Sequence, residues 1–316
     1  MAGFFAVLFA AVLFCFHNLI VRILFAPQKL LGVWEIGGFV TPTLNDSLLL
    51  LLLRMIWVVP LMALVANRLY AQTWTDLIQL VRLKQHPVLT RSLACGLLMF
   101  LYLVLLYISI SLIPTGIALT LFFTYPIFTA LLAWRLFGDI PTLLRWGVIF
   151  LTLLGTLLTI PYHSPAGEHS MWLGIFLGIA SGITYAGYTI FAQQALTQIH
   201  PVPFTWISFA VTLILSIISL SIWHPSATEF LWLPIGIGSL LSALFTFAGH
   251  VLNNWGIRLI GASRAAMIGA ANPALTVVLA ALTIQENLNG LQVLGVALVT
   301  LSVALLNYEK ARPSVS

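Results

Sequence analysis

Polar side chains inside apolar segments are the groups of this sequence best placed to do chemistry. Asn253 and Asn254 lie three and four residues after His250, within the apolar stretch 232–256, so a helix would present all three on one face. Such a face can hydrogen-bond a polar solute. It can also bond a neighbouring helix, which contributes about 0.6 kcal/mol per pair. Three strong polar groups together favour the lining of a solute-binding cavity.

A second group, His17 and Asn18, lies in the first apolar stretch, and Arg22 follows near its end. Histidine titrates close to neutral pH, so His17 could carry a coupling proton, although a lone membrane histidine more often anchors a hydrogen bond. We expect Arg22 to extend its charge toward the membrane interface.

The first stretch has an internal counterpart. Residues Gly3–Arg22 align with Gly174–Gln193 without a gap. In this alignment Tyr188 corresponds to His17, and Gln193 corresponds to Arg22. Both residues therefore join the candidate set. The second copy also carries glycines one turn apart, a spacing typical of close helix packing, at Gly174, Gly178 and Gly182.

Pro126 and Pro273 interrupt two further apolar stretches. Proline has no N–H and clashes with the carbonyl four residues earlier, here those of Phe122 and Gly269, so each helix should kink. A kinked helix with a free carbonyl can line a binding site, and a purely structural kink is the alternative. Candidate residues near the prolines or on the stretch 91–112 are Tyr102, Tyr107, Thr120, Thr124, Tyr125 and Asn272.

Arg54 lies about 12 Å deep in the stretch 46–67, at about 1.5 Å per residue. Such a depth is unfavourable for a charge in lipid, so Arg54 should point into the protein, bond carbonyls or reach outward. Glu35 and Asp46 are candidate partners. We expect a structural role for Arg54 rather than a substrate contact.

The acidic residues exclude some substrates, because every Asp and Glu lies at or beyond the end of a predicted helix. Proton-coupled export of cationic drugs needs a carboxylate inside the membrane, and no predicted helix has one at mid-depth. Binding of a phosphate ester needs a cluster of Lys and Arg, and only Arg22 and Arg54 lie near enough to the expected cavity. A neutral or zwitterionic metabolite, such as an amino acid, fits the polar lining best. No metal-ligand cluster or nucleophile motif is present, so we expect no cofactor, no metal and no enzyme activity.

The elements that position these residues are membrane-spanning helices. The chain of 316 residues is 61% hydrophobic and only 7% charged, against roughly 25% in soluble domains, and its few basic residues make no nucleic-acid footprint. A spanning helix needs about 20 apolar residues. Ten stretches qualify: 3–24, 46–67, 91–112, 115–137, 142–161, 171–195, 203–223, 232–256, 262–284 and 288–308.

Basic residues indicate the orientation, because cytoplasmic loops are enriched in Lys and Arg. We expect both termini in the cytoplasm and a location in the cell membrane, as in a bacterial inner membrane. Residues 25–45 should form an irregular outer loop, and residues 68–90 a short surface helix that begins near Thr75 and Asp76. The inner segments would hold Arg68, Arg82, Lys84, Arg91, Arg135, Arg145, Arg258, Arg264, Lys310 and Arg312.

The two halves of the chain repeat. Residues 114–126 match 261–273, and each proline is followed by an apolar run and an acid, Asp139 or Glu286. A repeat of five helices enters the membrane from the opposite side the second time, so residues 1–161 and 162–316 should form inverted repeats. Inverted repeats are typical of carriers that work by alternating access. An uncoupled channel or facilitator of the same fold is the alternative.

The tracts Ser111–Leu158 and Gly261–Leu306 resemble the EamA-type module of the drug/metabolite transporter superfamily. The resemblance implies ten helices, cytoplasmic termini and a central cavity lined by the first, third, fourth, sixth, eighth and ninth helices. Asp139 stands where that family usually has Glu. On this basis we expect a secondary transporter that exports a small solute, with proton coupling and oligomeric state left open.

Overall fold

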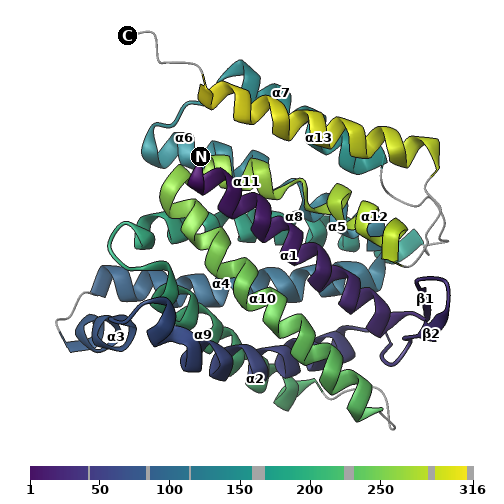
Figure 1. Ribbon diagram of the computed structural model, residues 1–316, viewed down its shortest axis with the longest axis horizontal. Coiled ribbons are helices and arrows are strands. Elements are labelled where there is room, and N and C mark those ends of the chain that lie inside the picture. Colours follow the sequence, from purple (N-terminus) through teal and green to yellow (C-terminus); the bar gives the residue numbers. More distant parts are fainter. Residues whose placement is uncertain are drawn as a thin grey trace.

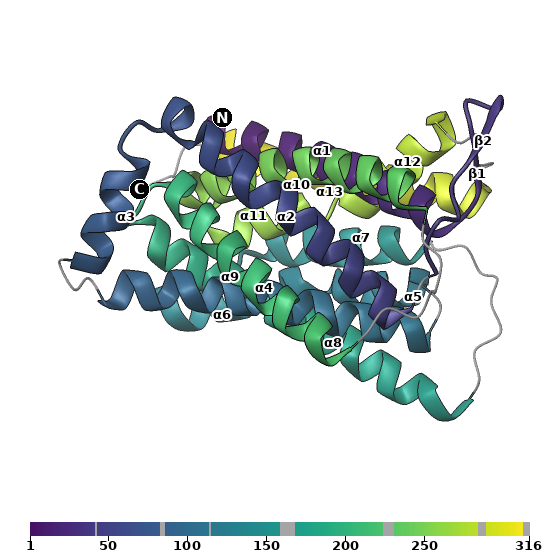
Figure 2. The ribbon, with the colours of Figure 1, turned by 90° about the horizontal axis from the view of Figure 1, so that it is seen from below.

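The protein is a bundle of apolar helices whose ends gather at two opposite faces (Figure 1, Figure 2). The computed structural model describes residues 1–41, 43–82, 86–113, 115–158, 168–223, 231–283 and 289–311. Its helices are α1 (Ala2–Phe25), α2 (Leu44–Leu69), α3 (Thr73–Arg82), α4 (His86–Leu112), α5 (Thr115–Phe122), α6 (Tyr125–Phe137), α7 (Leu143–Leu158), α8 (Glu168–Leu196), α9 (Pro201–Ile222), α10 (Trp232–Ile260), α11 (Ala262–Gly269), α12 (Asn272–Thr283) and α13 (Gly290–Ala311).

Within the described ranges, eight helical segments are long and apolar enough to cross a membrane. They include the segments made of α5 with α6 and of α11 with α12, and two shorter apolar helices, α7 and α13, accompany them. The chain is therefore an all-α, multi-pass membrane protein, as its composition predicts. Pro161, Lys84, Glu286 and Arg312 lie outside the described residues.

The prolines break their helices instead of kinking them. α5 ends at Phe122 and α6 starts at Tyr125, while α11 ends at Gly269 and α12 starts at Asn272. Each proline thus occupies the first turn of a new helix, where a missing N–H removes no hydrogen bond. Continuous kinked helices, which the sequence predicted over 115–137 and 262–284, are replaced by pairs of short helices.

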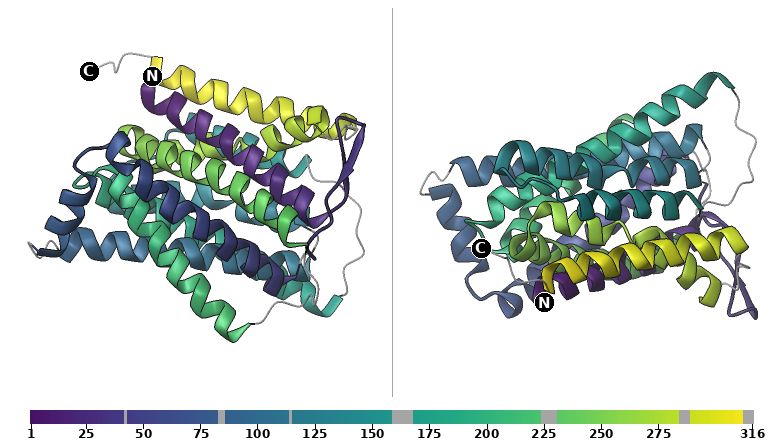
Figure 3. Two further views of the ribbon diagram at one scale, coloured as in Figure 1. Left: turned by 60° about the horizontal axis from the view of Figure 1, so that its bottom comes forward. Right: turned by 90° about the horizontal axis from the view of Figure 1, so that it is seen from above.

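The helices pack in pairs from the two halves of the chain: α1 with α10, α4 with α8, α2 with α9, and α7 with α13. Figure 3 shows α1 lying beside α10. Small residues allow the close approach, because a Cβ on Gly256 would lie 2.1 Å from Val7 Cγ2 and one on Gly238 2.7 Å from Leu24. The predicted close packing at Gly174, Gly178 and Gly182 occurs against the end of α4 and against α5.

The two faces of the bundle differ. At one face β1 (Gln28–Leu30) and β2 (Trp34–Ile36) form an antiparallel hairpin, which replaces the irregular loop expected there. Its turn includes Leu31 and Gly32, both with positive φ. The opposite face holds α3 and the start of α1 (Figure 2). The predicted helix in 68–90 exists, and its Trp74 packs edge-on against Trp206 of α9.

Candidate functional site

Arg54 of α2 is a buried charge, with 6% of its surface exposed, and it points into the bundle. Its Nη1 donates to Nε2 of His17 on α1 at 2.8 Å, and Nδ1 of His17 lies 2.7 Å from the Ser242 hydroxyl of α10. A guanidinium can only donate, so Nε2 of His17 must accept. The proton of the neutral imidazole therefore sits on Nδ1 and points toward Ser242.

The expected acidic partners of Arg54 are occupied elsewhere. Glu35 pairs with Lys29 at 3.4 Å on the exposed hairpin, and Asp46 accepts a hydrogen bond from Thr41. Among the residues that the structure describes, no carboxylate lies within salt-bridge distance of the guanidinium. His17 replaces the predicted acids as the partner because α1 and α2 both pack against α10, which brings the two side chains within hydrogen-bond reach.

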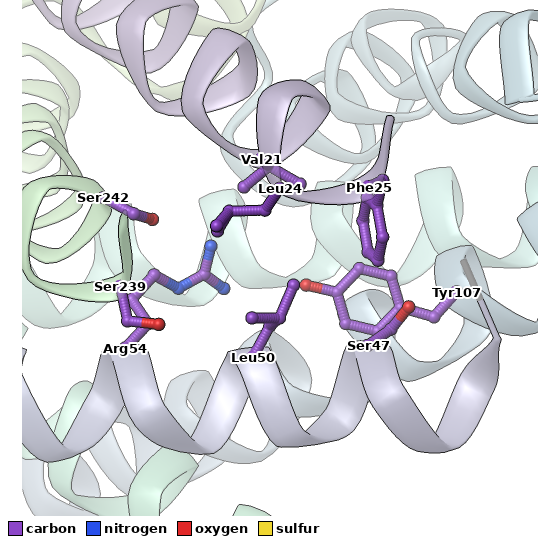
Figure 4. Close-up of a pocket in the computed structure, with 9 residues that line it drawn as sticks. All are labelled: Val21, Leu24, Phe25, Ser47, Leu50, Arg54, Tyr107, Ser239 and Ser242. Carbon is purple, nitrogen blue, oxygen red and sulfur yellow. The ribbon is translucent and has the colours of Figure 1, made fainter. Parts of the chain in front are cut away.

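A cavity adjoins Arg54 toward the hairpin face, between α1, α2, α4 and α10 (Figure 4). Its volume is about 10 Å³, which is close to the space that one water molecule needs. Two of the polar atoms around it, Arg54 Nε and Ser239 Oγ, are buried and have no hydrogen-bond partner within the described ranges. The lining residues are Val21, Leu24, Phe25, Ser47, Leu50, Arg54, Tyr107, Ser239 and Ser242.

Asn18 and Asn272 meet between α1 and α12. Asn18 Nδ2 donates to Asn272 Oδ1 at 2.8 Å, and Asn272 Nδ2 donates to the Ala11 carbonyl at 3.2 Å. Thr276 lies within 3.4 Å of both asparagine side chains. The residue before Pro273 therefore ties the break between α11 and α12 to α1.

The polar face of α10 divides between two environments. Asn254 is fully buried, accepts from the Tyr188 hydroxyl at 3.1 Å and donates to Thr205 of α9 at 2.8 Å. His250 is packed edge-on between Phe14 and Phe209, and its Nδ1 has no partner in the described part of the chain. Asn253 is 6% exposed on the same helix.

An aromatic cluster surrounds the break between α5 and α6. Tyr102 stacks on Phe122, and Tyr185 of α8 lies edge-on to both Tyr102 and Tyr125. Tyr188 stacks on Tyr185 in turn. The Tyr125 hydroxyl donates to the Ala266 carbonyl of α11 at 3.1 Å, so the two broken regions touch.

The remaining candidates lie apart from the cavity, except Tyr107, which lines it. Gln193 Oε1 accepts from the Ala262 N–H at 2.6 Å, where α11 begins, and Thr124 donates to the Leu121 carbonyl at 2.6 Å. Thr120 is buried on α5. Of the candidates, the structure thus brings His17 and Tyr107 to Arg54, joins Asn18 with Asn272, and joins Tyr188 with Asn254.

Sequence reasoning missed the small hydroxyl residues around Arg54. Ser239, Ser242 and Thr246 recur at spacings of three and four residues on α10, and Thr246 Oγ1 lies 3.4 Å from Nδ1 of His17. This spacing continues the polar face of His250 toward the hairpin end. This spacing was the signal in the sequence that could have predicted them.

Comparison with known proteins identifies the family. The model of the EamA-like transporter family matches residues 172–308. The chain is 68% identical over 312 residues to the uncharacterized transporter sll1319 of Synechocystis sp., covering 99% of this chain and 95% of that protein. A crystal structure with 16% sequence identity aligns with a TM-score of 0.68 over 97% of this chain and 98% of its own. The chain belongs to the EamA-like transporter family of the drug/metabolite transporter superfamily, and it is a membrane transporter of a small solute.

Proposed function

We propose that the protein is a secondary transporter that moves a small neutral or zwitterionic metabolite, such as an amino acid, by alternating access between two inverted five-helix repeats. The repeats are residues 1–161 and 162–316. The observation that carries the proposal is the pairing of helices. If the repeats are equivalent, α1 corresponds to α8, α2 to α9 and α4 to α10. Swapping corresponding helices turns the contact between α1 and α10 into a contact between α8 and α4, and the structure contains both contacts.

Several further pairs obey the same exchange. If the broken helices α5 and α6 correspond to α11 and α12, the contact of α6 with α8 becomes that of α12 with α1, which also exists. The pairs α2 with α9 and α7 with α13 each map onto themselves. A two-fold relation between five-helix units accounts for all of these pairs at once.

Individual contacts repeat as well. In the gapless alignment of Gly3–Arg22 with Gly174–Gln193, Asn18 falls on Thr189, and aligning the two prolines puts Thr129 on Thr276. Asn18 lies 3.4 Å from Thr276, and Thr189 lies 3.3 Å from Thr129. The same positions thus meet in each half, between the first helix of one repeat and the broken helix that packs on it.

Alternating access follows from this symmetry. A cavity of about 10 Å³ is far below the roughly 300 Å³ or more of a metabolite site, so helices must separate before a solute can enter. Separation of α1 and α10 from α2 and α4 would open the cavity of Arg54 to the hairpin face. Its symmetry-related movement would open the opposite face.

The side chains near the cavity support a polar, compact substrate. The cavity is lined by the hydroxyl groups of Ser47, Tyr107, Ser239 and Ser242, and the His17 imidazole bonds to Arg54 beside it. Acidic side chains are lacking near Arg54 in the described part of the chain. We assign export as the direction, the cell membrane as the location, and proton coupling to the membrane histidines. An uncoupled facilitator with the same fold is the second candidate.

Purified protein in liposomes tests the function. Counterflow of a panel of radiolabelled amino acids should show saturable accumulation of at least one of them. An imposed pH gradient should drive accumulation if protons are coupled, and His17→Ala should then abolish the drive. Accumulation that is insensitive to the gradient would assign the facilitator, and no counterflow of any amino acid would reject the proposed substrate class.

Topology is tested with single cysteines and a membrane-impermeant maleimide in intact cells. Val33→Cys on the hairpin and Leu231→Cys before α10 replace exposed residues that we place outside. Ile140→Cys and Gln198→Cys replace exposed residues that we place inside. Labelling of the first two alone, until the cells are permeabilised, is expected. Labelling of all four contradicts the inverted arrangement, and the reverse pattern contradicts the cytoplasmic placement of the termini.

A further inference from the structure

Arg54 carries a positive charge for which the described chain supplies no negative partner. Its side chain is buried in a membrane-spanning helix, and its one hydrogen-bond partner among the described residues is a neutral imidazole. An unpaired charge removed from water is among the least favourable arrangements in a protein, and in membranes it marks a substrate or ion pathway. A residue kept only to join α1 and α2 would not need a charge.

The hydrogen-bonding capacity of Arg54 is also incompletely used. A guanidinium has five N–H donors, and Nε of Arg54 is buried without a partner beside the cavity. Ser239 Oγ, on the same cavity, likewise has none among the described residues. In Figure 4 the guanidinium reaches from α2 toward α1, and the Tyr107 hydroxyl points toward the same group of side chains.

These groups select one ligand chemistry. The planar fork of a guanidinium matches the two oxygens of a carboxylate, and hydroxyl groups can complete the hydrogen bonds of such an anion. A phosphate ester carries close to two negative charges and would stay half uncompensated beside a single arginine. One carboxylate gives a neutral pair with Arg54 inside the membrane.

We infer that Arg54 binds the carboxylate of the transported solute, with Ser239 and Tyr107 beside it. This inference rests on the proposed transport function and defines the substrate by one carboxylate. His17 is a positioning residue, because its Nε2 holds one edge of the guanidinium and leaves Nε for the ligand. The carboxylate can belong to an amino acid or to an acid that lacks the amine. The described residues near Arg54 include no acidic side chain that would bind an ammonium group and so select the amino acid.

Matched solutes test the inference. The probes are the common L-amino acids, their carboxamides and the corresponding 2-oxo acids, measured by thermal stabilisation of the purified protein and by counterflow in liposomes. Carboxamides should bind about 10- to 100-fold more weakly than the amino acids that stabilise the protein, the loss expected for one charge-assisted pair. Equal binding of the 2-oxo acids would assign carboxylates in general, and weaker binding would assign amino acids.

Variants separate the charge from the fold. Arg54→Gln should lose stabilisation by carboxylates about 10- to 100-fold, while Arg54→Lys, which keeps the charge without the fork, should show an intermediate loss. Lys29→Gln removes a positive charge from the exposed hairpin at the same face and should behave as the wild type. If Arg54→Gln does not elute as a single species, the comparison rests on Arg54→Lys.

The two proposals fail differently. Transport of amino acids and carboxamides at equal rates, or unchanged carboxylate binding by both Arg54 variants, overturns the role of Arg54 and leaves the transport function standing. Binding of carboxylates that depends on Arg54 without any counterflow supports the site and rejects transport of these solutes. Stabilisation by neither class in the wild type overturns the site.

Discussion

Replacing Gly182 with alanine tests how closely α8 approaches the break between α5 and α6. A Cβ at this position would lie 2.8 Å from the Phe122 carbonyl oxygen, and 3.4 Å from both the Leu121 carbonyl oxygen and Thr124 Oγ1. Carbon and oxygen atoms usually stay about 3.3–3.6 Å apart even in favourable C–H···O contacts. Because the nearest obstacle is backbone, α8 or the broken region must move by roughly 0.5 Å to reach that separation.

The net effect combines two terms. Overpacking of this kind costs about 1–3 kcal/mol, while alanine gains about 0.5–1 kcal/mol over glycine inside a helix. Gly187→Ala on the same helix is the matched control, because its Cβ would meet only Leu98 Cδ1 at 3.7 Å, an ordinary contact. Gly187→Ala should gain the stability that alanine gives over glycine inside a helix, without the clash. Gly182→Ala should therefore be less stable than Gly187→Ala by about 1–3 kcal/mol.

The assay is thermal unfolding of both variants in the same detergent, followed by size-exclusion chromatography. An unfolding entropy of about 2.1 cal/mol/K per residue gives about 1.5 °C per kcal/mol for this chain, so about 1–3 kcal/mol corresponds to a difference of roughly 1.5–4.5 °C in melting temperature. The reasoning is refuted if Gly182→Ala melts at or above Gly187→Ala. Such a result would mean that α8 does not lie against the freed carbonyl of Phe122.

Two further predictions concern the helix interfaces. Tyr188→Phe removes the donor to Asn254 Oδ1 inside the bundle, so we expect a loss of about 1 kcal/mol in thermal unfolding, and little further loss when it is made in an Asn254→Ala background. At the α3 face, burial and then the charge of Arg258 lower the pKa of His200, which stacks on Tyr70. A lowered pKa means that the folded protein favours neutral His200, so stability should fall as the pH drops below about 6.5, the ordinary value of histidine. His200→Asn keeps a helix-capping side chain without titrating, and a melting temperature with the same acid dependence as the wild type would contradict this assignment.

Apolar length and proline positions were enough to predict most of the architecture. Uninterrupted apolar stretches such as 3–24 and 203–223 became α1 and α9 within a few residues, because lipid forces each spanning segment to satisfy its own backbone as a helix. The depth of Pro126 and Pro273 predicted where two helices are disturbed. Whether a helix bends or stops there depends on its neighbours, and the sequence predicted a bend where the structure has a break.

The hairpin was missed for a different reason. Its strands, Gln28–Leu30 and Trp34–Ile36, contain three residues each and show no alternation long enough to recognise. They are held partly by the bundle, since Gly38 and Phe39 donate to the carbonyls of Ile23 and Leu24 at the end of α1. Those contacts depend on how α1 ends.

The sequence alone determined three properties of this chain: that it is a membrane protein, which segments are helical, and which polar residues share a helix face. These properties follow from composition and from the helical period of 3.6 residues. Only the tertiary structure decided which faces meet. His250 and Asn254 share a face of α10, yet one lies among aromatic rings and the other bonds to Tyr188, since different helices cover them. Arg54 bonds to His17 rather than to an acid because α1 and α2 both pack against α10, and the spacing of residues along the chain does not record which helices meet.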